Sequence, residues 1–417
     1  MASDSLIKHR DFRLLWGGQT VSELGTFVTQ MSVPLLAALV LAATPLQMGL
    51  LGAAENAAFL LIGLPAGVWV DRMRRRRLMI TADLVRAALL LSVPVTWWLG
   101  GLTIAQLILV SLGISVCTVF FDVAYQSYLP ALVGREKLVE GNAKLQSTFS
   151  IAQISGTAIG GGLTQLVGAA NALLVDAGSF LFSVLTLWRI RTVEQPVAVP
   201  EQRSLRREVG EGLRFVFGNR NLRAIVGTTS SNNLCTNAFF AVAVLFLTRQ
   251  LHLPAGLIGL LSAAIGIGGV LGALASGAIT RRVGQARTIW LSVLITSPFL
   301  LLLPATKPGL LLGLWVVGSL VFGIGVVVYN VAQVSFRQAI CPDRLLGRMN
   351  ATVRFVVWGT MPVGALLGGA LGTWIGVHTT LWVAAIGAAL SPLFVTLSPL
   401  RTLRDIPTDQ PDAVSVD

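Results

Sequence analysis

Three carboxylates stand within long apolar stretches of this 417-residue sequence: Glu23, Glu55 and Asp176. A charged side chain at the centre of a bilayer costs about 2.5–3.5 kcal/mol on insertion scales, and such groups usually carry protons or ions or pair with other polar groups. We therefore treat these three carboxylates as candidates for proton coupling.

Glu23 belongs to a polar stripe. Gln19, Glu23, Thr26 and Gln30 follow one another at spacings of four, three and four residues, which places them on one face of a helix. One interpretation is that Glu23 exchanges protons with water in a central cavity. The alternative is a structural hydrogen bond from Glu23 to a neighbouring helix.

The other buried charges allow different interpretations. Glu55 is either a second proton site or a side chain that reaches the outer interface. Asp176 begins an apolar window, where an acid suits the positive end of the helix dipole, and we favour a structural role for it. Asp83 and Arg86 are three residues apart and are expected to form a structural pair.

The composition excludes most other classes of protein. Apolar residues make up 54% and charged residues only 12% of the chain, with a net charge of +12. Since apolar runs separate the basic residues, we expect no nucleic-acid partner. The sequence contains no phosphate-binding G-x-x-x-x-G-K-[ST] loop and no hydrolase or metalloprotease motif, so we expect no enzyme activity, no cofactor and no metal site.

Hydropathy predicts twelve membrane spans. A spanning helix needs about 20 mostly apolar residues. The qualifying windows are 14–41, 46–70, 78–99, 103–126, 147–167, 171–188, 224–248, 255–279, 288–305, 309–335, 352–375 and 378–399. The fold class is therefore an all-α integral membrane protein.

The basic residues predict the orientation of these spans. Of the 31 lysines and arginines, 27 lie in segments on one side of a twelve-span chain. Arg86 and Arg354 lie at helix starts on that same side, which leaves Arg249 and Lys307 for the other, external face. Loops rich in lysine and arginine stay in the cytoplasm, so both termini are expected there.

The chain divides into two similar halves. Shifting it by 208 residues aligns Gly160-Gly161 with Gly368-Gly369, and a shift of 210 aligns Gly67 with Gly277. We expect one six-helix half over 1–190, a cytoplasmic linker with an amphipathic helix over 191–222, a second half over 223–400 and a disordered cytoplasmic tail over 401–417. Such internal repeats are typical of transporters that bind substrate between their halves.

A short motif carries a family resemblance. The run from Gly67 through Asp71-Arg72 to Arg77 resembles the cytoplasmic signature of the major facilitator superfamily, and Phe121-Asp122 resembles its bacterial branch of enterobactin exporters and macrolide efflux proteins. The resemblance implies two pseudo-symmetric six-helix halves. It also implies a cytoplasmic gate built from Gly67, Asp71, Arg72, Arg75 and Asp122. The alternative is that the basic run only sets topology.

The resemblance further implies a central substrate cavity. Its candidate residues are polar or aromatic and lie on predicted cavity helices: Gln19, Thr26, Gln30, Tyr125, Asn232, Asn233, Thr236, Asn237, Tyr329, Asn330, Arg354 and Trp358. Arg354 could instead belong to the cytoplasmic gate. An apolar lining with few fixed polar groups suits amphipathic organic molecules.

Together these observations predict a secondary active exporter of a drug or secondary metabolite. We expect it to work by alternating access with proton antiport, as a monomer in the bacterial inner membrane, with the lipid bilayer, an amphipathic small molecule and protons as its partners. The alternatives are an importer or facilitator on the same fold, and a non-transporting receptor or scaffold. A scaffold would not need a carboxylate such as Glu23 within the membrane.

Overall fold

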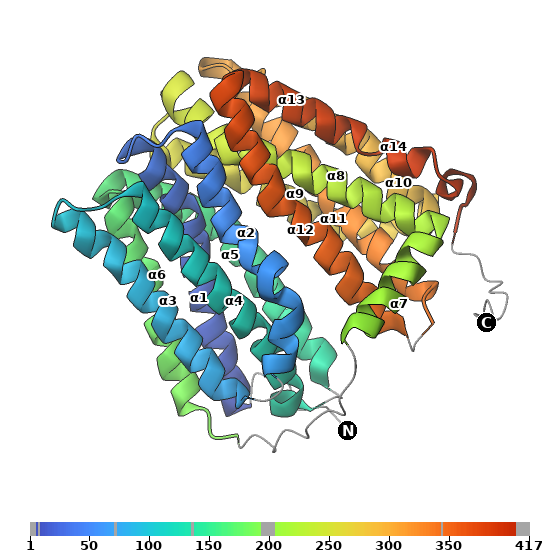
Figure 1. The fold of residues 1–417 in the computed structure, drawn as a ribbon, viewed down its shortest axis with the longest axis horizontal. Helices are drawn as coiled ribbons and strands as arrows, with labels where there is room; N and C mark the ends of the chain where they lie inside the picture. The colour runs from blue at the N-terminus through green and yellow to red at the C-terminus, as the bar shows by residue number, and fades with distance from the viewer. Residues whose placement is uncertain are drawn as a thin grey trace. The chain divides into compact units, whose positions relative to one another are not determined.

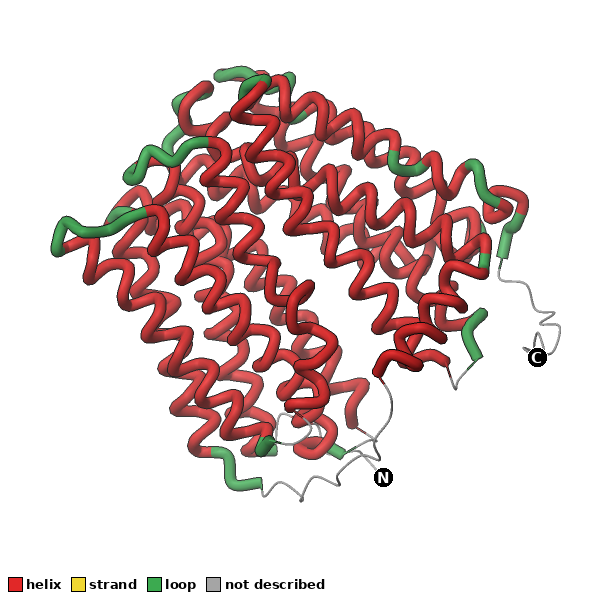
Figure 2. The backbone as a smooth tube through the Cα atoms, viewed as in Figure 1, coloured by secondary structure: helices red, strands yellow, loops and turns green. Residues whose placement is uncertain are grey.

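The computed structural model describes residues 6, 9–70, 73–134, 137–192, 205–342 and 345–405. All regular elements in these ranges are helices joined by loops (Figure 2). The first half contains six long helices: α1 (Arg10–Leu39), α2 (Pro45–Val70), α3 (Arg75–Trp98), α4 (Ile104–Val133), α5 (Leu138–Val167) and α6 (Ala169–Arg189).

The second half begins with a short helix and continues with long ones. Its elements are α7 (Leu205–Gly218), α8 (Arg220–Leu245) with a π-helical end (Phe246–Gln250), α9 (Ala255–Val283), α10 (Gln285–Thr296) with a 3₁₀ end (Ser297–Leu302), α11 (Leu312–Ala339) preceded by a 3₁₀ turn (Gly309–Leu311), α12 (Leu346–Trp374), α13 (Val377–Leu390), α14 (Leu393–Thr396) and a final 3₁₀ turn (Pro399–Thr402).

The predicted all-α membrane architecture is confirmed, because each of the twelve windows coincides with one of these helical segments. Ten segments of the described chain are long and apolar enough to span a bilayer by composition alone. The other two long helices are α1 and α5. Their hydropathy is lowered by polar residues, which include Glu23 in α1 and Glu140 and Lys144 in α5.

The helices form two compact units that do not follow the two halves. The first unit contains residues 1–201, 237–266 and 361–381, and the second contains 202–236, 267–360 and 382–417. Within the first unit, α1 packs along α5 and α6, while α3 packs along α4 and α6 (Figure 1). Segments of the second half therefore pack with the helices of the first half.

Glycines allow the closest of these contacts. A Cβ atom added at Gly161 of α5 would lie 2.6 Å from the carbonyl oxygen of Ala255 and 2.7 Å from Cα of Gly259. A Cβ atom at Gly49 of α2 would lie 2.7 Å from Cα of Gly369 in α12. The repeat relates these two contacts, because Gly49 aligns with Gly259 and Gly161 with Gly369. Both lie at the helix ends far from the arginine-rich loops.

In the second unit, the predicted amphipathic helix is present as α7 and packs on α12. Its Val216 is fully buried in a cluster with Met349 and Val353. Glu211 of α7 also forms an ion pair with Arg348 at the start of α12. The amphipathic sequence of α7 thus buries apolar side chains against a spanning helix.

The start of the C-terminal tail is ordered where we expected disorder. The carbonyl oxygen of Arg404 accepts a hydrogen bond from the amide of Ala286 at 3.0 Å, and Asp405 Oδ1 accepts one from the amide of Gln285 at 3.0 Å. The first amides of α10 have no acceptor within their own helix, and the tail supplies one. The rest of the expected tail, 406–417, lies outside the described residues.

Candidate functional site

Glu23 is half-buried on the polar stripe of α1. Gln19, one helical turn earlier, donates a hydrogen bond from Nε2 to Glu23 Oε1 at 2.9 Å. Thr26 is half-buried, whereas Gln30 is exposed. The described contacts therefore tie Glu23 to its own helix, through an amide that accommodates either protonation state.

Charged groups from two other helices act on Glu23. Asp122 of α4 and Arg86 of α3 both act electrostatically on its carboxyl group, and Glu23 and Asp122 both act on the hydroxyl of Tyr125 in α4. The structure thus places Asp122, which the motif assigned to the cytoplasmic gate, within electrostatic range of Glu23. A carboxylate with one acidic and one basic neighbour can change its charge when either neighbour changes partner.

Arg86 is the centre of a buried charge cluster. Its guanidinium carbon lies 4.4 Å from the ring centroids of both Phe121 in α4 and Phe180 in α6. Arg86 is 5% exposed, and it forms an ion pair with the fully buried Asp83 one turn earlier. The two aromatic rings and one carboxylate hold this cation at the junction of α3, α4 and α6.

Asp176 lies between α6 and α1. It is buried, accepts a hydrogen bond from Ser179 Oγ at 2.8 Å and faces Gly25 of α1, where a Cβ atom would lie 2.5 Å from Asp176 Oδ1. Arg86 acts on it through space. These contacts favour the structural interpretation of Asp176, because they join two helices.

Glu55 of α2 is half-buried in a different environment. Its backbone carbonyl accepts a hydrogen bond from Ser115 Oγ of α4 at 2.8 Å. No hydrogen bond or ion pair to its carboxylate is found among the described residues.

The expected cytoplasmic gate is described only in part. Asp71 and Arg72 lie outside the described residues, and Gly67 lies in the last turns of α2. Arg75 donates from Nη1 to the carbonyl oxygen of Ser127 in α4 at 3.2 Å. Arg76 donates from Nε to the carbonyl oxygen of Leu187 in α6 at 2.7 Å. The basic run therefore contacts the backbone of both helices.

Several cavity candidates of the second half join helices to one another. Asn232 Nδ2 donates to Ser391 Oγ at 3.3 Å, and Asn233 Nδ2 donates to the carbonyl oxygen of Val357 at 3.2 Å. Tyr329 is 5% exposed, and its hydroxyl lies 2.7 Å from Thr229 Oγ1. These polar groups hold α8 against α11, α12 and the end of α13.

The remaining candidates differ in exposure. Arg354 is exposed and stacks over Trp358 of the same helix at 4.1 Å from the ring centroid. Asn330 is exposed and accepts a hydrogen bond from Gln333 at 3.1 Å. Thr236 is buried and hydrogen-bonds to backbone carbonyls of its own helix, and Asn237 is half-buried. Of these, Arg354 and Asn330 present the most accessible polar groups.

Two positions gain a role that the sequence analysis did not give them. Arg86 was interpreted only as half of a local pair, because the rings that enclose it come from other helices. Arg249 was assigned only to the external face, yet its Nη2 donates to the carbonyl oxygens of Ala38 at 3.2 Å and Ala43 at 2.8 Å. It thereby satisfies one carbonyl group in the last turn of α1 and one in the loop that follows.

Twelve helical spans built from a repeated half define a membrane transporter with the major facilitator fold. The family model described as transmembrane secretion effector matches residues 3–414, and the chain belongs to this family of the major facilitator superfamily. The resemblance found in the sequence is thereby confirmed.

Relatives with known names agree with this assignment. The chain is 27% identical over 376 residues to the multidrug efflux pump Tap of Mycolicibacterium fortuitum, covering 86% of this chain and 88% of the pump. It is 28% identical over 416 residues to the enterobactin exporter EntS of Salmonella typhi, covering 97% and 96%.

The fold itself has solved counterparts. A bacterial homologue of the iron transporter ferroportin, crystallised in an inward-facing state, superposes with a TM-score of 0.77 at 16% identity, covering 94% of this chain and 99% of the other. At this identity the likeness shows the fold alone.

Proposed function

We propose that this transporter exports amphipathic organic molecules from the bacterial cytoplasm by alternating access, in exchange for protons. The observation that carries the proposal is the position of Glu23 on the polar stripe of α1, with Asp122 and Arg86 as its charged neighbours. The names of the relatives, a multidrug efflux pump and an enterobactin exporter, support export as the direction.

Glu23 is the proposed proton site. Desolvation favours the neutral form of a carboxyl group, whereas a nearby cation or an opening to water favours the charged form. A cationic or hydrogen-bonding substrate and a proton would therefore exclude each other at Glu23. Equilibrium coupling requires this exclusion to act equally in both directions.

Arg86 is the proposed partner in this exchange. The fourth-helix window, residues 103–126, contains no basic residue. Arg86 supplies a buried cation from α3 instead, in electrostatic range of both Glu23 and Asp176. It would favour the charged form of Glu23 after the proton has left.

Everted inner-membrane vesicles test direction and coupling together. Vesicles from a pump-deficient strain, with and without the overexpressed chain, are given an acid-inside pH gradient and ethidium as an amphipathic probe. The proposal predicts gradient-dependent accumulation inside the vesicles, with release of protons to the outside, and collapse of both by nigericin. A pH gradient that drives ethidium out would instead indicate an importer, and no effect of any gradient on a panel of such dyes would contradict proton antiport.

A further inference from the structure

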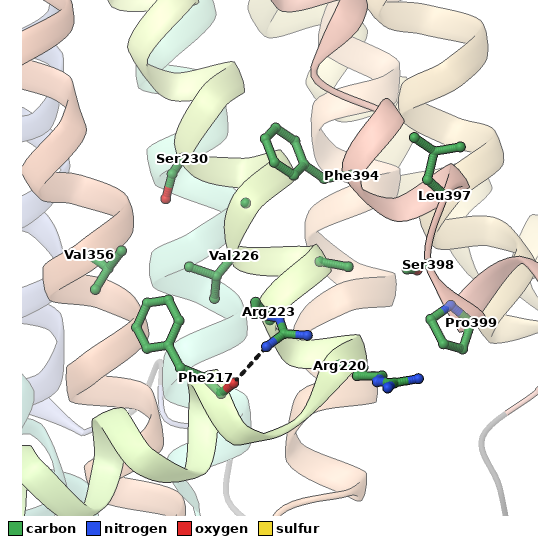
Figure 3. Close-up of a pocket in the computed structure, with 12 residues that line it drawn as sticks. Phe217, Arg220, Arg223, Val226, Ser230, Val356, Phe394, Leu397, Ser398 and Pro399 are labelled. Atoms are coloured by element: carbon green, nitrogen blue, oxygen red, sulfur yellow. Dashed lines mark hydrogen bonds between the residues drawn. The ribbon is translucent and has the colours of Figure 1, made fainter.

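A groove in the second unit is not explained by transport. It has a volume of about 860 Å³ and lies where α8 meets the segment that follows α13. Its walls combine apolar side chains with two arginines, Arg220 and Arg223, on the first turn of α8 (Figure 3). From this combination we propose that the groove binds an anionic phospholipid of the cytoplasmic leaflet.

The groove forms because the last spanning helix is interrupted. Helix α13 ends at Leu390, and the chain resumes only in the short α14 and the 3₁₀ turn that starts at Pro399. Phe394 lies over Gly227 of α8, so that a Cβ atom at this glycine would meet the phenyl ring at 3.0 Å. The interruption leaves Phe394 53% and Leu397 80% exposed on the wall of the groove.

The first half shows how the same place is closed. There, Asp11 Oδ2 accepts hydrogen bonds from the amides of Arg191 at 3.2 Å and Thr192 at 2.9 Å, and from the Thr192 hydroxyl at 2.7 Å. These bonds tie the start of α1 to the chain that leaves α6. Helix α6 runs without interruption from Ala169 to Arg189, and these hydrogen bonds close the end of the first half.

The second half lacks both sides of this closure. At the repeat shift of 210, Asp11 aligns with Asn221, whose buried Oδ1 has no hydrogen-bond partner in the described chain. At the shift of 208, Arg191 aligns with Pro399, which has no amide proton, and Thr192 aligns with Leu400, whose amide is bound by Ser398 Oγ at 3.3 Å. In the described chain, the hydrogen bonds that close the end of the first half therefore have no counterpart beside the groove.

The two arginines at the groove favour an anionic ligand. Arg220 and Arg223 are exposed, and neither forms an ion pair with an acid in the described chain. Arg223 donates one hydrogen bond from Nη1 to the carbonyl oxygen of Phe217 at 3.4 Å (Figure 3), and its other guanidinium nitrogens make no hydrogen bond to the described residues. Each of the two guanidinium groups can donate a pair of parallel hydrogen bonds to the oxygens of a phosphate group.

The apolar wall of the groove and its expected location on the cytoplasmic side favour a lipid as the anionic ligand. Phe217, Phe394 and Leu397 offer exposed hydrocarbon surface beside the arginines, which suits an acyl chain continuous with a headgroup. Arg220 lies in the linker 191–222 that we expect in the cytoplasm, and Arg223 follows this linker directly. Basic pockets between spanning helices on that side are suited to anionic headgroups.

Native mass spectrometry of the full chain tests the proposal. The protein is released from nanodiscs of equal parts phosphatidylglycerol and phosphatidylcholine, and retained lipid is counted. Wild type should retain phosphatidylglycerol in preference. Each arginine near an anionic membrane surface contributes about 1 kcal/mol to lipid binding, which corresponds to about fivefold in affinity. Arg223→Gln should therefore lower the apparent affinity for phosphatidylglycerol about fivefold, and Arg220→Gln combined with Arg223→Gln should lower it about thirtyfold.

Matched controls distinguish lipid binding at the groove from a general effect of positive charge on lipid retention. Arg10→Gln with Arg13→Gln removes the two arginines that align with Arg220 and Arg223 at the closed end of the first half, and should leave lipid retention unchanged. Replacing both groove arginines by lysine should preserve part of the preference. Leu397→Trp, at an exposed position, should lower retention by filling the groove while keeping the charge.

Three results would overturn the proposal. They are equal retention of both lipids by wild type, equal loss in the Arg10/Arg13 control, and displacement of phosphatidylglycerol by millimolar inorganic phosphate, which would indicate an anion site without a lipid. The melting temperature of each variant is measured in the same nanodiscs, so that loss of fold is distinguished from loss of lipid.

Discussion

Replacing Arg86 by methionine tests whether the buried cation organises the first half. Arg86 is 5% exposed and Asp83 is fully buried, so the substitution leaves a carboxylate without its partner in the protein interior. Removing one member of a buried pair typically destabilises a protein by about 3–5 kcal/mol. Methionine keeps much of the apolar volume and still contacts the two phenyl rings, so packing loss contributes less.

A double variant provides the control. Asp83→Asn combined with Arg86→Met removes both charges, and should lie within about 2 kcal/mol of wild type, because a buried pair replaced as a whole is often nearly neutral. Unfolding is followed by equilibrium denaturation in mixed micelles. A loss below about 1 kcal/mol for Arg86→Met, or a double variant as unstable as the single one, would refute the reasoning.

Three further predictions concern the gate, the helix contacts and the closed end of the first half. Asp71→Asn and Arg75→Ala should slow ethidium transport without lowering the melting temperature; wild-type turnover in both would reduce the basic run to a topology signal. Gly161→Leu should abolish transport because a side chain there meets the backbone of α9, whereas Gly162→Leu, in open space, should not. Asp11→Ala should cost about 1–3 kcal/mol of stability at neutral pH. Burial alone would raise the pKa of Asp11, but hydrogen bonds from the hydroxyl and amide of Thr192 and the amide of Arg191 lower it, so this contribution should vanish as pH falls through the folded-state pKa.

The twelve spans could be predicted because each corresponds to a local run of mostly apolar residues. The amphipathic α7 was equally visible, since Leu213 and Val216 recur between charges. The link between Gln19 and Glu23 also follows from spacing alone. Such features depend on the chain within one or two helical turns.

The charge cluster could not be predicted in the same way. Phe121 and Phe180 enclose Arg86 only after α3, α4 and α6 have packed together, and no local pattern indicates this. For Asn232 and Asn233, likewise, the sequence could not identify Ser391 and Val357 as the residues of other segments that accept hydrogen bonds from their amides. Polar residues in a spanning helix signal that a partner exists without identifying it.

The account rests most directly on Glu23. Purified wild-type and Glu23→Gln protein are reconstituted in liposomes, and ethidium accumulation under a pH gradient, downhill exchange and the pH dependence of binding are measured, with Glu55→Gln as the matched control. Glutamine mimics the protonated carboxyl group. The account predicts that Glu23→Gln loses gradient-driven accumulation, keeps part of the downhill exchange and binds ethidium independently of pH, while Glu55→Gln stays coupled. Full gradient-driven accumulation by Glu23→Gln would contradict it.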